Sequence, residues 1–456
     1  YVETVEGITF DSWEKVADAW TAVDFSYATW WSSTEVIDEL LFVNGLDQIQ
    51  EWSGGMTTFA SYGTKTLTKQ GTGSWANARF LITGTTLLRI KDSGGTWREF
   101  TYTGGESTTT LTGVTPDPAT AGFTFNAGAL IMQSVRLNDN EPVDGAVNDF
   151  IKVADNQLWI GSNTRSHVYV SKDTDFTSFA FSSPRVPGEG ALLILDSSGR
   201  AFAKQRNKMC IAAGRNDWYI NEFEQITVGS TLSETLKIRK LKTGVGKAAR
   251  HHDLVIEVGD YIAFIDFNNE LMMLGDIENL EGPQLQTLSD PIKPDFDDED
   301  FTNGHIKAHK NRIYIACPAT SHLWINETRQ NLNGSLTRFW QPPQILPIRK
   351  LTVISDNIHG HSSGFEETYK LFDGTNDNGN SFKANATYSY RNYDIGNALK
   401  IFDEWYTEGR ISANTELILR LNYDYGGATQ QSEKIIKGSD SAIIFESLAG
   451  GSLGDE

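Results

Sequence analysis

Short strand-like runs separated by turn-forming residues constrain this chain more than any other feature of its sequence. The stretch from His167 to Ile220 contains the runs VYV, FAF, ALLILD, RAFAK, MCIAA and DWYI, with KDTD, SSPRVPGEG, DSSG, QRN and GRND between them. Val, Ile, Tyr, Phe and Trp fit a pleated, half-buried surface, whereas Gly, Pro, Asn and Asp supply turn geometries that those residues resist. Strands that recur about every 8–12 residues indicate an all-β sandwich, barrel or propeller.

The same pattern continues through most of the chain. Roughly twenty such runs occur, and little helical periodicity follows residue 36. Grouped in fours, they predict a degenerate β-propeller of about five to six blades, in which radial repetition protects nearly every strand edge. A tandem of sandwiches is the alternative, and no WD or kelch repeat of fixed period is visible.

Three regions follow from the distribution of these runs. Residues 37–380 are the predicted propeller-like body. Residues 103–128 within it are rich in Thr, Gly and Pro, and we expect them to form an inserted β lobe. Residues 381–456 contain longer strands that alternate more cleanly, so they either close the propeller or form a small sandwich.

The N-terminal residues 1–36 differ from the rest because they are aromatic and acidic. The segment SWEKVADAW predicts a short helix with Ser12 as its N-cap. Trp13, Val16 and Trp20 would lie on one face of that helix, at helical spacing.

The charge and cysteine content narrow the class of protein. The 456 residues include 59 acidic and 39 basic ones, for a net charge of −20. This balance argues against a general nucleic-acid or anionic-membrane binder, although a local basic patch could still do such work. No run approaches the ~20 apolar residues of a membrane-spanning helix, so we expect no membrane-spanning segment. The two cysteines, Cys210 and Cys317, lie in strand-like runs and are predicted to be buried free thiols.

One local basic run stands out between Lys237 and Arg250, where six Lys or Arg residues occur without an acid. It is either a patch that contacts DNA or an acidic partner, or a solvated connection in an acidic protein. Most runs of like charge are solvated connections. The candidates for partner or DNA contact are Lys237, Arg239, Lys240, Lys242, Lys247 and Arg250.

Two short motifs resemble the Asp box, a structural hairpin of sialidase-like propellers. DSGGTW begins at Asp92 and has Ile90 where the box usually has Ser, while SKDTDFT begins at Ser171 and has Asp175 in place of Gly. In this box the Asp carboxylate accepts hydrogen bonds from turn amides and the aromatic residue packs under the next strand, so it marks blades rather than catalysis. The residues assigned to these structural turns are Asp92, Gly94, Thr96, Trp97, Ser171, Asp173 and Thr177.

The sequence contains no recognisable catalytic, metal or cofactor constellation. G-x-S-x-G, P-loop and dinucleotide fingerprints do not occur, and no motif selects a carboxylate pair for glycoside hydrolysis among the 59 acids. Asp295, Asp297 and Glu299 alternate as calcium ligands do, but Asp300 stands where that loop needs Gly. We therefore expect no catalytic residue, no metal and no cofactor.

Several segments together resemble structural proteins of tailed bacteriophages that have β-propeller-like bodies. These segments include LLFVNGLDQIQEWSGG, FTYTGGESTTTLTGV, HVYVSKDTDFTSFAF with RVPGEG, AAGRNDWYI, and TGVGKAARHHDLVIEVGDYIAFIDFNNEL. The likeness covers much of residues 38–425. It implies a non-enzymatic virion component, either a tail hub or nozzle or a minor tail protein. Such a protein is assembled in the host cytoplasm with other tail proteins and copies of itself, and can help to close the DNA channel.

A carbohydrate-active tail propeller is the alternative, either a receptor-binding module or a glycosidase. The 12 Trp and 15 Tyr could stack on sugars, although core packing explains most of them. A cleft with two carboxylates ~5–10 Å apart, flanked by exposed aromatic residues, would favour this alternative. An extracellular adhesion module unrelated to phage is a third hypothesis, which the shortage of disulfides weakens slightly.

Overall fold

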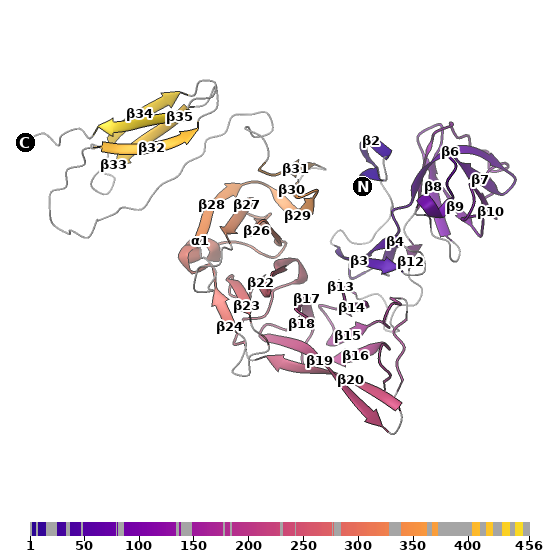
Figure 1. The fold of residues 1–456 in the computed structure, drawn as a ribbon, viewed down its shortest axis with the longest axis horizontal. Helices are drawn as coiled ribbons and strands as arrows, with labels where there is room; N and C mark the ends of the chain where they lie inside the picture. Colours follow the sequence, from indigo (N-terminus) through magenta and orange to yellow (C-terminus); the bar gives the residue numbers. More distant parts are fainter. Residues whose placement is uncertain are drawn as a thin grey trace, which may run out of the picture. The chain divides into compact units, whose positions relative to one another are not determined.

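The computed structural model is built almost entirely of β-strands (Figure 1). The chain divides into two compact units, residues 1–373 and 374–456. The structure describes residues 2–5, 8–14, 25–32, 37–46, 49–78, 80, 86–133, 136–137, 148–176, 178–182, 185–228, 231–241, 243–275, 277, 284–327, 339–362, 367–372, 404–410, 416–422, 431–437 and 443–449.

Six antiparallel sheets follow one another along the first unit, and Figure 1 shows them fanned round a common axis. We number them as blades 1 to 6. Blade 1 contains β3 (Ser26–Ser32), β4 (Ile37–Val43), β5 (Gln50–Trp52) and β12 (Arg136–Leu137), and blade 2 contains β13 (Phe150–Ala154), β14 (Gln157–Gly161), β15 (His167–Val170) and β16 (Ala191–Ile194). Blade 3 contains β17 (Gly199–Gln205), β18 (Lys208–Ala213), β19 (Asp217–Val228) and β20 (Thr231–Leu241), and blade 4 contains β21 (Val255–Val258), β22 (Tyr261–Ile265), β23 (Leu271–Gly275) and β24 (Gln284–Thr287). Blade 5 contains β25 (His305–His309), β26 (Arg312–Cys317), β27 (His322–Glu327) and β28 (Phe339–Ile345), and blade 6 contains β29 (Ile348–Ile354), β30 (Asn357–Ser362) and β31 (Thr368–Lys370).

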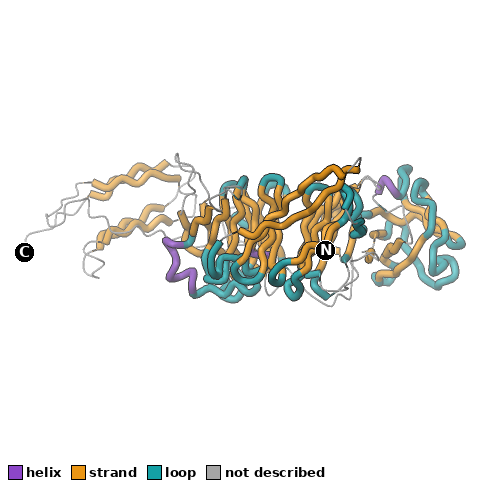
Figure 2. Tube along the Cα trace, turned by 90° about the horizontal axis from the view of Figure 1, so that it is seen from below, coloured by secondary structure: helices purple, strands orange, loops and turns teal. Residues whose placement is uncertain are grey.

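The first strand of each blade contacts the first strand of the next, from β3 through β13, β17, β21 and β25 to β29. These six strands are therefore the innermost ones and line the axis. Seen edge-on in Figure 2, the strands stand side by side and their turns lie at both rims. The prediction of an all-β, propeller-like fold is confirmed, and six blades fit the expected five to six.

Alternation of side chains along each strand fills the space between blades. In β26, Ile313 and Ile315 join the cluster shared with blade 4, whereas Tyr314 and Ala316 join the cluster shared with blade 6. A strand packed on both faces needs apolar residues at nearly every position, which explains the continuous run IYIAC. The two cysteines are buried free thiols in these interfaces, as predicted.

A β lobe is inserted in blade 1 between β5 and β12. Its sheet has the order β10-β7-β6-β11-β8-β9, and backbone hydrogen bonds in both directions between Thr101 and Thr115, at 2.7 and 2.8 Å, join its two ends. The lobe is therefore a closed barrel around the aromatic residues Phe59, Trp75 and Phe100. Its elements are β6 (Met56–Gly63), β7 (Thr66–Lys69), η1 (Ala76–Ala78), β8 (Thr86–Lys91), β9 (Trp97–Tyr102), β10 (Thr110–Thr112) and β11 (Leu130–Gln133).

The predicted insertion at 103–128 covers only part of this lobe, which starts at Met56 and ends at Gln133. The strands before residue 103 alternate like those of a blade. Strand pattern alone could not separate them from the ring, because only their pairing partners differ.

The helix expected near Ser12 is wrong over its first turn, because Ser12 and Trp13 belong to β2 (Ile8–Glu14), which pairs with β1 (Val2–Val5). Apolar Ile8 and Phe10 alternate with Thr9 and Asp11, and this period of two favours a strand. Val16 and Trp20 lie outside the described residues. The remaining helical elements are η2 (His252–Leu254), η3 (Asp290–Ile292) and α1 (Lys293–Asp297).

The second unit consists of two antiparallel strand pairs among its described residues. β32 (Glu404–Arg410) pairs with β35 (Ile443–Ala449), and β33 (Glu416–Asn422) pairs with β34 (Gln431–Lys437). The unit begins at Gly374, seven residues before the predicted boundary at 381.

Candidate functional site

A two-stranded arm projects from blade 3. β19 pairs with β18 only from Asp217 to Ile220, whereas it pairs with β20 as far as Val228. Residues 221–238 therefore extend beyond the four-stranded part of the blade, and we call them the arm (Figure 1). The basic run begins on this arm.

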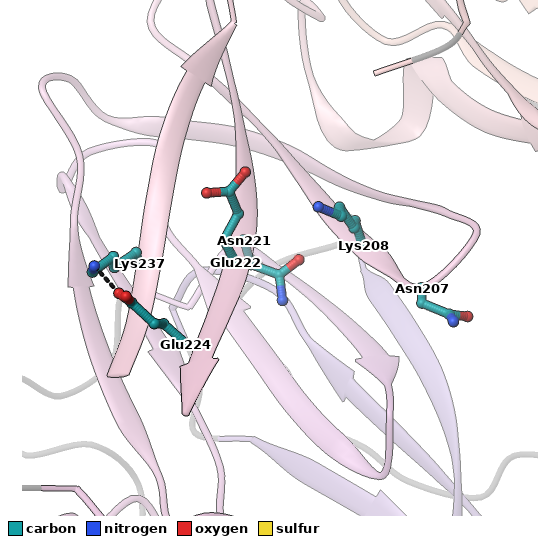
Figure 3. A pocket seen from close by; sticks show the side chains of 6 residues that line it. All are labelled: Asn207, Lys208, Asn221, Glu222, Glu224 and Lys237. Atoms are coloured by element: carbon teal, nitrogen blue, oxygen red, sulfur yellow. Dashed lines mark hydrogen bonds and ion pairs between the residues drawn. The ribbon is translucent and has the colours of Figure 1, made fainter. Parts of the chain in front are cut away.

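One face of the arm carries ion pairs between its two strands. The ammonium of Lys237 contacts the carboxylate of Glu224, and Arg239 Nε lies 2.8 Å from Glu222 Oε1. Figure 3 shows Lys237 and Glu224 pointing toward each other beside a polar hollow of about 580 Å³. All four side chains are at least 38% exposed, so water screens the pairs and each contributes little to stability. The hollow is lined by Asn207, Lys208, Asn221, Glu222, Glu224 and Lys237.

The opposite face of the arm is fastened to blade 2. Arg185 pairs with Glu234 of β20, and each side chain is at most 10% exposed. The backbone N–H of Glu234 and the hydroxyl of Ser233 donate to the Arg185 carbonyl oxygen, at 2.9 and 3.1 Å. Leu236 and Ile238 pack on the core between blades 2 and 3. These contacts fix the direction of the arm.

The rest of the basic run is compensated in a similar way. Lys240 Nζ lies 2.9 Å from Asp217 Oδ2 and 3.2 Å from Asp196 Oδ2, which joins blade 3 to the end of β16. The ammonium of Lys247 contacts Asp266 and Glu270.

Arg250 Nη1 donates to Asn269 Oδ1 at 2.6 Å, while Lys242 lies outside the described residues. The run is therefore not a free basic patch, because four of its residues bind carboxylates of the same chain.

The first Asp-box-like motif forms the expected hairpin. Asp92 Oδ1 accepts hydrogen bonds from the backbone N–H groups of Gly94 and Thr96, both at 2.9 Å, and Oδ2 accepts one from Arg98 at 2.8 Å. Hydrogen bonding by the Thr96 amide, and then by Arg98, lowers the pKa of Asp92. Trp97 is half-buried, with Arg89 and Lys91 over its ring. The hairpin joins β8 and β9, so it belongs to the inserted lobe rather than to a blade.

The second motif lies in blade 2, after β15. Ser171 is buried, and its hydroxyl oxygen accepts a hydrogen bond from the Leu158 amide at 2.8 Å. The exposed Asp173 donates its backbone N–H to the Gly188 carbonyl at 2.7 Å. This turn is thus held through the hydroxyl and the backbone. Thr177 lies outside the described residues.

Ionisable side chains that the sequence did not single out meet on the axis. Asp253 in η2 contacts the ammonium of Lys350 from β29, and lies 3.6 Å from His252 Nε2 and 3.9 Å from His305 Nε2. The Leu351 amide donates to His305 Nδ1 at 3.3 Å, so the imidazole carries its proton on Nε2, toward Asp253. Blades 4, 5 and 6 are tied together here.

Burial and charge set the protonation of this axial cluster. Burial lowers the pKa of His305 to about 3, so its ring is neutral at pH 7. Burial also acts to raise the pKa of Asp253, but the nearby His252 and Lys350 outweigh it and lower that pKa to about 2.

Further along the axis, Lys152 of β13 reaches across to Glu257 of β21, with 2.5 Å between Nζ and Oε1. Blade 3 lies between blades 2 and 4, and the backbone N–H of Lys204 in that blade donates to the same Glu257 oxygen, so the ion pair bridges the inner edge of blade 3. Lys204 Nζ lies 2.7 Å from Asp155 Oδ1. Lys307 of β25 is half-buried, and burial and then the charge of Lys152 lower its pKa.

The acidic loop does not bring its carboxylates together. Asp295 and Asp297 lie on α1, and Asp300 Oδ1 accepts a hydrogen bond from the Thr302 amide at 2.9 Å. Glu299 instead turns inward and accepts hydrogen bonds from His322 Nδ1 at 2.6 Å and from Trp324 Nε1 at 2.7 Å. Within the described ranges, no group of three or more His, Cys, Asp or Glu could hold a metal ion.

Comparisons with known proteins add little beyond the fold. No protein-family model and no curated protein matches the chain. The crystal structure of BamB from Moraxella catarrhalis shares 14% identity with it over 46% of this chain and 56% of that one, with a TM-score of 0.27. The WD40 domain of SCAP from fission yeast shares 10% identity over 64% of this chain and 77% of that one, also with a TM-score of 0.27. The chain thus spans little more than half of the BamB chain, and likenesses this distant carry no functional argument. Of the helices that the structure describes, none is long and apolar enough to cross a membrane.

Proposed function

We propose that this chain is a non-enzymatic structural component of a bacteriophage tail, in the hub or nozzle or among the minor tail proteins. It assembles in the host cytoplasm with copies of itself, as a ring, and with other tail proteins, and it helps to close the DNA channel of the virion. The resemblance of its sequence segments to tail proteins with propeller-like bodies supports this assignment.

The observation that carries the proposal is the rigid arm of blade 3. The arm is the outer part of two strands of 12 and 11 residues, and the buried pair of Arg185 and Glu234 fixes it against blade 2. A preformed, two-stranded projection can dock on a neighbour without losing conformational entropy on binding. The inserted barrel is a second projecting element with a core of its own.

Contact with packaged DNA would be non-specific and is not assigned to the basic run. Four of its residues already bind carboxylates, so phosphate groups would have to displace these partners. We propose instead that these charges stabilise the arm and the contacts between blades.

Sedimentation of the purified full chain with and without its arm tests the proposed assembly. One variant replaces residues 222–237 by a two-residue Asn-Gly turn, and a matched control replaces the lobe, residues 56–133, by a short Gly-Ser linker. We expect the intact chain to form closed oligomers and the armless variant to remain monomeric with its circular dichroism spectrum otherwise retained. An armless variant that assembles like the intact chain would remove the arm from the proposal.

A further inference from the structure

The polar hollow of blade 3 lies where the arm leaves the blade. The ladder between β18 and β19 ends at Ile220, and Asn221, the first residue of the arm, lines the opening that follows. Asn207 lies in the turn between β17 and β18, Lys208 begins β18, and both line the same space of about 580 Å³. Ligand pockets commonly have volumes of about 300–1,000 Å³, so the hollow is large enough for a small molecule.

Asn221 presents a donor to this hollow that the chain does not use. The residue is only 2% exposed, and its Oδ1 accepts a hydrogen bond from the Met209 amide at 2.5 Å. This bond identifies the oxygen of the side-chain amide, so Nδ2 is the donor. Among the residues that the structure describes, no acceptor takes a hydrogen bond from Nδ2, and Figure 3 shows the side chain among those that line the hollow. An N–H group in such a buried side chain costs free energy when it has no partner, which favours an acceptor from outside the chain.

Two carboxylates of the arm supply acceptors beside this donor. Glu222 and Glu224 lie two residues apart on β19, so they leave the same face of the strand about 7 Å apart. Arg239 contacts Oε1 of Glu222 and Lys237 contacts Oε2 of Glu224, which holds both side chains in place. Within the described ranges, the second oxygen of each carboxylate accepts no hydrogen bond.

The lining of the hollow favours a ligand that is polar and uncharged. Two lysines and two glutamates contribute equal and opposite charge, so an anion would meet the carboxylates and a cation would meet the ammonium groups. None of the six lining side chains is apolar, so a hydrophobic ligand would bury little apolar surface. A hydroxyl group both donates and accepts, so neighbouring hydroxyls can donate to a carboxylate and accept from an amide N–H.

We propose that this hollow binds a saccharide. Asn221 Nδ2 donates to a hydroxyl oxygen of the sugar, and the second oxygens of Glu222 and Glu224 accept from neighbouring hydroxyls. Both carboxylates already contact cations of the arm, so the hollow binds the sugar without cleaving it. The site needs a single copy of the chain and is therefore independent of the assembly proposed above.

Saturation-transfer NMR on the full chain tests the site with a panel of glucose, galactose, mannose and N-acetylglucosamine. The variant is Asn221→Asp, because aspartate keeps the oxygen that accepts from the Met209 amide and replaces Nδ2 by a second oxygen. Asn216→Asp is the matched control, because Asn216 Oδ1 accepts a hydrogen bond from the Gly246 amide at 2.7 Å and its side chain does not line the hollow. Circular dichroism verifies that both variants fold.

We expect at least one sugar of the panel to bind the unmodified chain and N216D equally well. The loss of one hydrogen bond in N221D should raise the dissociation constant of that sugar roughly three- to tenfold. An absence of saturation transfer to every sugar, or equal binding by N221D and N216D, would overturn the proposal. If N221D does not fold, Asn207→Ala replaces it with the same expectation, because Asn207 is exposed in a turn and lines the hollow.

Discussion

The arm and the axis both carry lysines, yet the surroundings of these charges differ. On the arm, basic residues that lie close together in the sequence alternate with apolar ones. Their side chains pair with carboxylates on the facing strand. On the axis, lysines from distant parts of the chain lie on the innermost strands, and burial and then the charge of Lys152 lower the pKa of Lys307. A dense basic run is therefore no guide to a basic surface. Lysines that are scattered in the sequence, each on the first strand of a blade, can create a basic surface.

The largest expected effect comes from the buried pair that fixes the arm. Arg185→Met should leave the Glu234 carboxylate buried and uncompensated, and destabilise the protein by about 3–5 kcal/mol. Denaturant unfolding measures this loss. The double variant R185M/E234L should recover much of it, because an apolar pair leaves no buried charge. A single variant that costs less than about 1 kcal/mol would show that the pair does not hold the arm.

The axial cluster should make stability depend on acid pH. The pKa of Asp253 is lowered in the folded protein to about 2, so its contribution is present above the ordinary pKa of a free Asp and is lost as the pH falls toward 2. The contribution is on the order of 2 kcal/mol. Asp253→Asn should be less stable at pH 7 and should lose less stability between pH 5 and pH 2, measured by denaturant unfolding at each pH. Identical slopes in the variant and the unmodified chain would contradict this role.

Two lysines of the axis should respond to the same substitution with opposite signs. Lys152→Met removes the partner of Glu257 and should destabilise the fold by about 0.5–1 kcal/mol. Lys307→Met removes a half-buried charge that has no carboxylate within 4.0 Å among the residues described by the structure, and should stabilise the fold by about 1 kcal/mol in chloride buffer. Thermal unfolding of both variants in the same buffer compares them. Equal signs would erase the distinction drawn between these positions.

The smallest effect is expected on the exposed face of the arm. Lys237→Ala breaks the pair with Glu224, but both side chains are at least half exposed, so the loss should be under about 0.5 kcal/mol. Thermal unfolding at low and high salt should show the difference fade as salt screens the pair. A loss above 1 kcal/mol would mean that the arm depends on its surface charges as well as on Arg185.

The sequence predicted the architecture well because the fold is built from local signals. Turn residues and alternation mark each antiparallel meander, and the apolar run of β26 reports burial on both faces. The barrel could not be separated from the ring, because its closure depends on the bond between Thr101 and Thr115 rather than on strand pattern. The helix predicted at Ser12 is wrong because the alternation from Ile8 to Asp11 continues a strand through Ser12 and Trp13.

The candidate sites also differ in whether local sequence signals could predict them. The compensation of Arg239 by Glu222 could have been predicted from the register of the hairpin, since Glu222 faces Lys237 and so lies diagonal to Arg239 on the same face. Asp253, His305 and Lys350 belong to three successive blades, so only the packing of these blades against one another brings them together. The available signal was a basic residue in the first strand of most blades.

Electron microscopy of intact phage particles beside the purified chain tests the central proposal most directly. The account predicts tail density made of several copies of a six-bladed body with its barrel lobe, arranged as a ring with the arm of each copy against a neighbour. A purified chain that stays monomeric and has no matching density in the particle would contradict the structural role.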